Sequence, residues 1–447
     1  MKFDVNLSPR KINLEALVVF ACGFFSTMPI ISIPIRGNYI SLFTIVFLGE
    51  LVLMLSNNTI GSLTLDIHIK QLVLWLFISL FSSVFGTIFI SLYSQLTVSG
   101  TYIIKIILYI LFISYWGSNR SREENNNALC RGLLYGSIVN IIWSIFDAAC
   151  WYIAGIPISN SVFRDYMHAN NLLYIGLAMP TGLYRSGGLN FDPAHLGFLC
   201  PFLVAYSLIS EKYSLLVLAI GGLLASASTT GIVCSCFIFV FWAWNKIAVK
   251  NVYCTRIKLS KLYKALLVAC VLFTFTIIFH GPLFQIINKA TSFLFSRVET
   301  TYLTKSADFA RFGGPRLDFI RFFPTAIIKS GLLLLVGTGL GTSSYGYLDI
   351  ASAMGIVQNS LYDIENTYLA YLFDTGIVGF IIFLGIMYRI LRYYKNMYKR
   401  KELDFTGTIA FAGVLSMILS FLFYHYILFA PQVLLTVVAL IHMDWYE

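Results

Sequence analysis

The chain contains repeated runs of apolar residues that are long enough to cross a lipid bilayer. A transmembrane helix needs about 20 predominantly apolar residues, and the run at 71–92 meets that length. Only 12% of the 447 residues are charged and 58% are hydrophobic, whereas ordinary globular domains carry roughly 25% charged residues. The sequence therefore predicts an all-α, polytopic integral membrane protein, with residues 1–447 forming a single transmembrane domain.

Separating the apolar runs at helix-breaking residues predicts about twelve spans. The first run follows Lys2, Arg10 and Lys11, as a signal peptide would, but it lacks a small-residue cleavage motif. We therefore expect it to be retained as a span. The expected spans are residues 14–33, 38–56, 71–92, 99–117, 131–155, 194–210, 213–227, 229–245, 264–280, 367–388, 405–424 and 426–443.

The distribution of Lys and Arg predicts the orientation of these spans. With a cytoplasmic N-terminus, most of the basic residues fall in inner loops, including clusters at 246–264 and 389–401. The positive-inside rule then places both termini in the cytoplasm. The same rule accounts for the net charge of +10, so no nucleic-acid partner is expected. Two external loops result, at 156–194 and 281–366, and both contain arginines.

A polar, turn-rich stretch, RSGGLNFDPAHLG, runs from Arg185 to Gly197 between apolar segments. Non-helical backbone is tolerated at membrane depth only where protein or a water-filled cavity surrounds it. The planar guanidinium of Arg185 suits two-pronged binding of phosphate or carboxylate. Solvation, or pairing with an acidic side chain, is the alternative interpretation.

The external loop 281–366 is too long to lack structure in a compact domain. Arg316 and Arg321, with phenylalanines beside them, predict an amphipathic helix on the outer membrane surface. Snorkelling of these arginines to lipid headgroups is the alternative. Further along, GTGLGTSSYGY at 337–347 predicts either a tight turn or a backbone cradle for phosphate. Neither a preceding strand nor a GK[ST] sequence accompanies it, which argues against a nucleotide site.

The stretch DIENTYLAYLFDTGIVGFIIFL at 363–384 leads into a long apolar helix. Glu365 at the membrane boundary is a candidate general base, because a partly dry site raises a carboxyl pKa. The alternative is that Asp363, Glu365 and Asn366 cap the helix. Gly376 and Gly379 are expected to allow close helix packing.

Charged and thiol side chains within the spans give further expectations. Asp147 and Lys105 are costly inside a membrane and are expected to be functional or paired. The eight Cys lie in or next to apolar runs, so neither a disulfide framework nor a zinc site is expected.

Three of these stretches, in this order, resemble the O-antigen polymerase and ligase superfamily of bacterial envelope biogenesis. The mid-chain element in that family reads R-x-x-G-x-x-x-x-P-x-x-x-[AG], which matches Arg185 to Gly197. An Arg about twenty residues before a G-x-G-x-G turn is matched by Arg316 and 337–341. The ligase element H-N-x-Y-L is matched by Glu365 to Leu369, with Glu in place of the ligases' proposed catalytic His. That departure favours the Wzy-type O-antigen polymerase branch.

The resemblance implies a GT-C-like fold, in the bacterial inner membrane, that works on undecaprenyl-diphosphate-linked repeat units at the periplasmic face. It implies no metal ion and no cofactor, and a chain-length regulator as a partner. By resemblance, Arg185 and Arg316 neutralise the diphosphate leaving group, and Glu365 accepts the proton of the attacking hydroxyl. Asp192 and His195 are alternative proton acceptors. The remaining residues expected to contact the diphosphate or sugar are Arg311, Arg321, Asn366, Tyr368 and His168.

Two other functions stay open from the sequence. An O-antigen ligase would transfer the same glycan onto lipid A–core, and only the Glu365 departure argues against it. A lipid-linked oligosaccharide flippase would also suit many spans with intramembrane charges. A long Arg-rich external loop and the lack of an apparent internal repeat argue against such a transporter.

Overall fold

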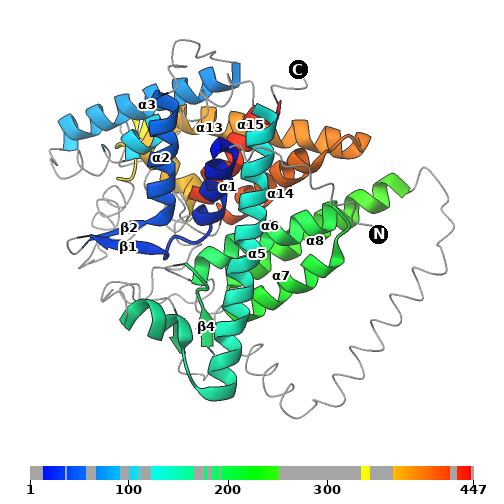
Figure 1. Ribbon diagram of the computed structural model, residues 1–447. Helices are drawn as coiled ribbons and strands as arrows, with labels where there is room; N and C mark the ends of the chain where they lie inside the picture. The colour runs from blue at the N-terminus through cyan, green and yellow to red at the C-terminus, as the bar shows by residue number, and fades with distance from the viewer. Residues whose placement is uncertain are drawn as a thin grey trace, which may run out of the picture.

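The structure, a computed structural model, is mostly helical and carries two small antiparallel hairpins (Figure 1). All structural statements below concern the residues that it describes. These are residues 14–35, 38–56, 67–90, 100, 102–108, 111, 122–165, 176–178, 184–190, 193–250, 334–342, 366–422 and 430–443.

Most of the expected spans coincide with a helix. Residues 102–108 are helical within the expected span 99–117, and the expected span 264–280 lies outside the described residues. Two described helices, Glu123–Ala154 and Thr367–Arg400, are long and apolar enough to cross a membrane by length and composition. The twelve-span topology stays a prediction.

The described helices are α1 (Leu14–Ser26), α2 (Leu42–Ser56), α3 (Ile67–Ile90), α5 (Arg122–Ala154), α6 (Pro193–Ile209), α7 (Tyr213–Ser226), α8 (Thr229–Lys250), α13 (Thr367–Arg400), α14 (Phe405–Ser420) and α15 (Ala430–Met443), with a π-helical turn η2 (Asn160–Asp165).

The expectation of a continuous helix over 14–33 was wrong. Helix α1 ends at Ser26, and strand β1 (Ser32–Ile35) pairs antiparallel with β2 (Asn38–Ser41), with Ser32 opposite Ser41. Proline removes a helical hydrogen bond and clashes with the preceding turn, and this segment contains Pro29 and Pro34. The two prolines make a helix through this region unfavourable, so the chain turns into a hairpin instead.

Helix α5 begins at Arg122, well before the expected start at 131, because its first turns make tertiary contacts. Asn125 Nδ2 donates to Glu15 Oε1 of α1 at 2.7 Å, and Asn127 Oδ1 accepts from Thr406 of α14 at 2.7 Å. Further along, α1 and α5 approach so closely that a Cβ on Gly23 would lie 2.5 Å from Leu129 O. Small residues allow such backbone approach between helices.

Hydrogen bonds between helices show how α5, α6, α13 and α14 are oriented relative to one another. The start of α5 lies beside the start of α14, through Asn127 and Thr406. Near the other end of α14, Ser416 Oγ donates to Phe198 O near the start of α6, at 2.9 Å. The end of α14 also holds the start of α13, because Thr367 N donates to Phe421 O at 3.0 Å. The starts of α6 and α13 therefore lie at the same end of the helical assembly, which we call the hairpin end. The opposite end contains Asp404 and is called the Asp404 end.

Candidate functional site

Arg185 lies in the middle of a short strand at the hairpin end. Strand β4 (Tyr184–Ser186) pairs antiparallel with β3 (Gly176–Ala178), with Leu177 opposite Arg185. Successive side chains of a strand point to opposite faces. The structure shows this alternation directly, since Tyr184 and Ser186 are buried and Arg185 is partly exposed. Only the outer two side chains of the strand therefore face the protein interior.

The interior face of β4 is anchored on Asp147, a fully buried carboxylate of α5. Asp147 Oδ2 accepts hydrogen bonds from Ser186 Oγ at 2.6 Å and from Tyr184 Oη at 2.9 Å. Its Oδ1 accepts from Ser159 N at 2.8 Å. Burial, reinforced by the negative charge of Asp147, raises the pKa of the Tyr184 hydroxyl, which keeps it a hydrogen-bond donor. The expectation that Asp147 is functional or paired is met by three hydrogen bonds from neutral donors.

The turn after β4 is fixed by Asn140 of α5. Leu189 N donates to Asn140 Oδ1 at 2.9 Å, and Asn140 Nδ2 donates to Thr27 O at the end of α1. Gly188 has a φ of +63°, and a Cβ there would collide with the Asn140 side chain. Only glycine adopts this conformation in so little space. The non-helical backbone at 185–190 is thus lined by protein, whereas residues 193–197 form the first turn of α6.

Arg185 itself extends to the end of α7, where Arg185 Nε donates to Ser226 O at 3.2 Å. The last carbonyl groups of a helix lack intrahelical partners and carry partial negative charge, so they favour a cation. His195 lies in the first turn of α6, directly after this element, and is partly exposed. Both predicted residues therefore lie at the hairpin end.

Asn366 and Tyr368 hold the start of α13 against the end of α14. Asn366 is the N-cap of α13: its Oδ1 accepts from Leu369 N at 3.1 Å and its Nδ2 donates to Leu422 O at 2.9 Å. Tyr368 Oη donates to Ile418 O at 2.9 Å. The helix-capping interpretation is thus confirmed for Asn366. The described contacts tie these two residues to α14 and tie Arg185 to α7.

The Gly-rich stretch forms a tight turn whose amides bind protein acceptors. Thr338 N and Gly339 N donate to the carbonyl oxygens of Phe373 and Asp374, at 2.8 and 2.9 Å. Gly341 N and Thr342 N donate to the two carboxylate oxygens of Asp374, at 2.9 and 3.1 Å. These contacts support the tight turn over the phosphate cradle, because a carboxylate of the chain itself receives the amides of the turn.

The turn packs into an interruption of α13. Gly376 has φ +67° and ψ 179°, so α13 consists of two helical pieces that meet there. Ser82 Oγ of α3 donates to Val336 O at the start of the turn and approaches Thr375 O at 3.5 Å. The expected close packing at Gly376 is confirmed, since a Cβ there would lie 2.5 Å from Val336 C, although Gly376 also marks a break in the helix that was not expected.

Sequence reasoning missed Asp374, although its signal was present. Asp374 is an acidic side chain inside an apolar segment, and it is fully buried. An acidic residue in such a place is costly unless it is hydrogen-bonded. Lys105 is likewise a charged side chain inside an apolar segment. Its Nζ lies over the Tyr102 ring, 5.5 Å from the ring centre, in a cation–π contact.

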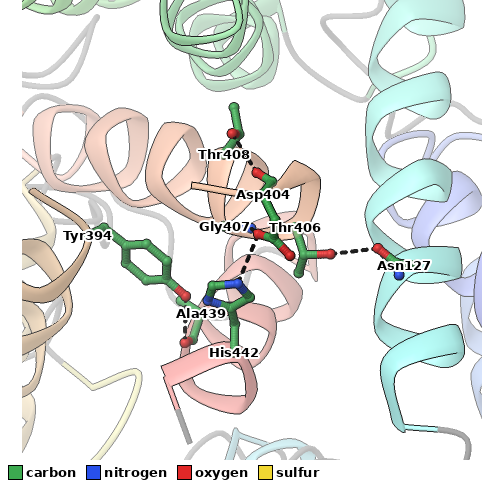
Figure 2. A network of polar contacts seen from close by, with 8 residues as sticks. All are labelled: Asn127, Tyr394, Asp404, Thr406, Gly407, Thr408, Ala439 and His442. Carbon is green, nitrogen blue, oxygen red and sulfur yellow. Dashed lines mark hydrogen bonds and ion pairs between the residues drawn. The ribbon is translucent and has the colours of Figure 1, made fainter. Parts of the chain in front are cut away.

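A second polar cluster lies at the Asp404 end (Figure 2). Asp404 caps α14 by accepting from Gly407 N at 2.6 Å, and the same oxygen pairs with His442 Nε2 of α15 at 2.9 Å. The His442 ring stacks on Tyr394 of α13, with ring centres 5.6 Å apart. Burial alone raises the pKa of Asp404, but the hydrogen bonds from His442 and Gly407 and the charge of His442 outweigh it. The pKa of Asp404 is lowered as a result.

Several predicted site residues lie outside the described residues. They are Glu365, Arg316, Arg311, Arg321, Asp192 and His168.

The described part of the chain contains no group of three or more His, Cys, Asp or Glu side chains placed to hold a metal ion. Six of the cysteines are described, and all six are free thiols. Comparison with known proteins gives no assignment: neither a protein-family model nor a curated protein matches the chain significantly.

Proposed function

We propose that this protein is a multi-pass membrane glycosyltransferase of the Wzy type, which polymerises lipid-linked glycan repeat units at the outer face of the bacterial inner membrane. Its donor is a growing glycan on undecaprenyl diphosphate, and its acceptor is a new lipid-linked repeat unit. About twelve spans, cytoplasmic termini and a chain-length regulator as partner belong to the same proposal.

The observation that carries the proposal is the placement of Arg185. This arginine stands on a non-helical element fixed between α5, α6 and α7, and that element is where the family motif falls. A fixed guanidinium that meets developing negative charge lowers a reaction barrier more than a solvated one, because it needs no reorganisation during the reaction. A diphosphate leaving group is the charge that such a transferase must stabilise.

The reaction needs no other energy source, because the sugar–diphosphate bond is already activated. The acceptor hydroxyl oxygen forms a new bond to the anomeric carbon while the bond to the diphosphate oxygen breaks. The lipid diphosphate leaves with the bonding electrons, held by Arg185 and Arg316. The hydroxyl proton passes to Glu365, in the role that general-base catalysis gives a carboxylate near a partly dry boundary.

The exposed faces of the helices support a membrane location. Large apolar side chains cover them, as in Phe77 and Phe81 of α3, Trp244 of α8, and Ile381 of α13. Exposed apolar surface on this scale marks contact with a membrane or with other proteins. In a bilayer these side chains would face lipid.

A lipid-linked oligosaccharide transporter is the second candidate, and one observation favours it. Helix α13 is interrupted at Gly376 beside the buried Asp374. Discontinuous helices at membrane depth line the substrate sites of many transporters. An assay that separates bond formation from lipid movement distinguishes the two functions.

The decisive experiment uses purified protein in liposomes with one substrate, an undecaprenyl-diphosphate-linked repeat unit. We expect a ladder of lengthened products, resolved by gel or mass, without any further acceptor. Transfer only after addition of lipid A–core would establish a ligase. Movement of the lipid between leaflets with no new glycosidic bond would establish a transporter.

Replacing Arg185 with Ala tests the role of the arginine in the same assay. We expect the rate of ladder formation to fall about 100-fold or more, as when one transition-state charge stabiliser is removed. Arg400→Ala is the matched control, because Arg400 is exposed in an ion pair with Glu402 near the Asp404 end. Long chains at a normal rate from Arg185→Ala would remove this residue from the mechanism.

A further inference from the structure

Asp147 holds Arg185 without touching it. The two residues that flank Arg185 in the strand, Tyr184 and Ser186, both donate to the same oxygen of the buried Asp147 carboxylate. Because side chains alternate along a strand, fixing both neighbours on the interior face leaves Arg185 on the opposite face. There its Nε reaches Ser226 O at the end of α7.

We call the two hydrogen bonds from Tyr184 and Ser186 to Asp147 the clamp. Three further contacts hold it in place. The Tyr184 ring stacks on Trp151 of α5, with ring centres 5.0 Å apart. The backbone of Tyr184 is held as well, because Tyr184 N donates to Tyr152 Oη of α5 at 3.1 Å. Ser186 Oγ also accepts from Gly188 N at 3.1 Å. Both ends of the strand therefore contact α5, and the turn that follows it is fixed to the Ser186 side chain.

We propose that Asp147 is a positioning residue, which aims the Arg185 guanidinium at the diphosphate of the lipid-linked substrate. The inference rests on the proposed function, since it assigns Arg185 that ligand. Asp147 acts through the strand and contacts neither the ligand nor the reacting atoms.

The chemistry of the clamp explains why a carboxylate occupies this position. A carboxylate only accepts hydrogen bonds, whereas an asparagine amide presents one acceptor and one donor. An Asn side chain could still accept from Ser159 N, but its NH2 group would then face the Ser186 and Tyr184 hydroxyls, which would have to accept instead of donate. The substitution therefore reverses two of the three hydrogen bonds and removes the charge from all of them. The charge also makes each bond stronger than a neutral one. A charged group this deep is costly, and three donors offset that cost.

The test measures binding of sugar-free undecaprenyl diphosphate to the purified full-length protein by native mass spectrometry. A double-mutant cycle compares the wild type, Asp147→Asn, Arg185→Ala and the double variant. We expect Asp147→Asn to weaken binding about tenfold, the loss of one well-placed charged interaction. The double variant should bind no more weakly than Arg185→Ala alone, because Asp147 acts only through Arg185.

A second pair of variants keeps the test decisive if Asp147→Asn folds poorly. Ser186→Ala removes one arm of the clamp, whereas Ser161→Ala removes an exposed hydroxyl that, among the described residues, donates to Pro157 O at 3.2 Å. Ser186→Ala should weaken binding and Ser161→Ala should leave it unchanged. Hydrogen exchange of the segment 184–190 provides a readout that needs no ligand, and it should speed up in Asp147→Asn and Ser186→Ala.

The outcomes separate the two proposals. Additive losses in the cycle would overturn the positioning role, because a purely structural residue weakens binding independently of Arg185. Unchanged binding in both Asp147→Asn and Ser186→Ala would overturn it as well. Failure of the wild type to bind the lipid diphosphate would overturn the proposed function together with this ligand for Arg185. Faster exchange at 184–190 would still report the clamp in that case.

Discussion

At the scale of single residues, Gly376 decides how α13 accommodates the Gly-rich turn. Its φ of +67° belongs to the region that L-residues with a side chain rarely adopt. A Cβ there would also lie 2.5 Å from Val336 C and 2.7 Å from Gly337 N. Conformation and space therefore both require glycine at this one position.

Gly376→Ala is expected to destabilise the protein by about 2 kcal/mol or more, since it combines backbone strain with a steric clash. The matched control is Gly385→Ala in the same helix, where a Cβ meets nothing within 4 Å. Ala is favoured over Gly in a helix by about 1 kcal/mol, so the control should be neutral or stabilising. Thermal unfolding in detergent measures both variants, and equal melting temperatures would contradict the assigned break.

At the scale of elements, Asp404 joins three helices at one end of the molecule. It caps α14, pairs with His442 of α15, and through the His442 ring reaches Tyr394 of α13 (Figure 2). Thr406, in the first turn of the same helix, extends the cluster to Asn127 of α5. This cluster fixes how the last three helices meet at their Asp404 ends.

The lowered pKa of Asp404 predicts a pH-dependent contribution to stability. A carboxyl group with a folded-state pKa below its unfolded value of about 4 stabilises the fold above that value and loses this effect as pH falls through the folded pKa. Asp404→Asn keeps an N-capping side chain but removes the charge. We expect it to melt below the wild type at pH 7, with the difference shrinking as the pH falls below about 4. A difference that stays constant down to pH 3 would rule out the charge as its cause.

At the scale of the whole molecule, the directions of α5, α6, α13 and α14 place the hairpin end and the Asp404 end opposite one another. The hairpin end contains Arg185, His195 and the start of α13, whereas the basic end of α13 and the cap of α14 lie at the Asp404 end. If the long axis of the helices crosses a bilayer, these ends face different compartments. The proposed orientation puts the Asp404 end in the cytoplasm, in line with its basic residues.

Labelling with a membrane-impermeant maleimide tests this arrangement in a variant whose eight cysteines are replaced. Ile156→Cys, after α5, and Glu402→Cys, before α14, are both exposed positions. We expect Cys at 156 to react in spheroplasts and Cys at 402 to react only after permeabilisation. Equal reactivity of both positions in spheroplasts would contradict opposite placement.

Much of the secondary structure could be predicted because it depends on local patterns. Apolar runs of helical length gave α6, α7 and α8 to within a few residues at most of their ends, since burial of apolar side chains and backbone hydrogen bonding act along one segment. The start of α5 and the β1–β2 hairpin were missed. In the first case the polar residues 122–130 join a helix because α1 and α14 supply partners for Asn125 and Asn127.

The candidate site also has a part that the sequence predicted and a part that only the tertiary structure showed. The sequence alone determined a strongly apolar, mostly helical chain and singled out Arg185 and Asp147 as polar groups that need a reason for their place. Only the tertiary structure decided that Asp147 anchors the strand that carries Arg185, and that Asp374 occupies the amides of the Gly-rich turn. The partners in these contacts lie more than 30 residues apart. No local pattern specifies such a pairing, because it depends on which helices pack together and in which direction.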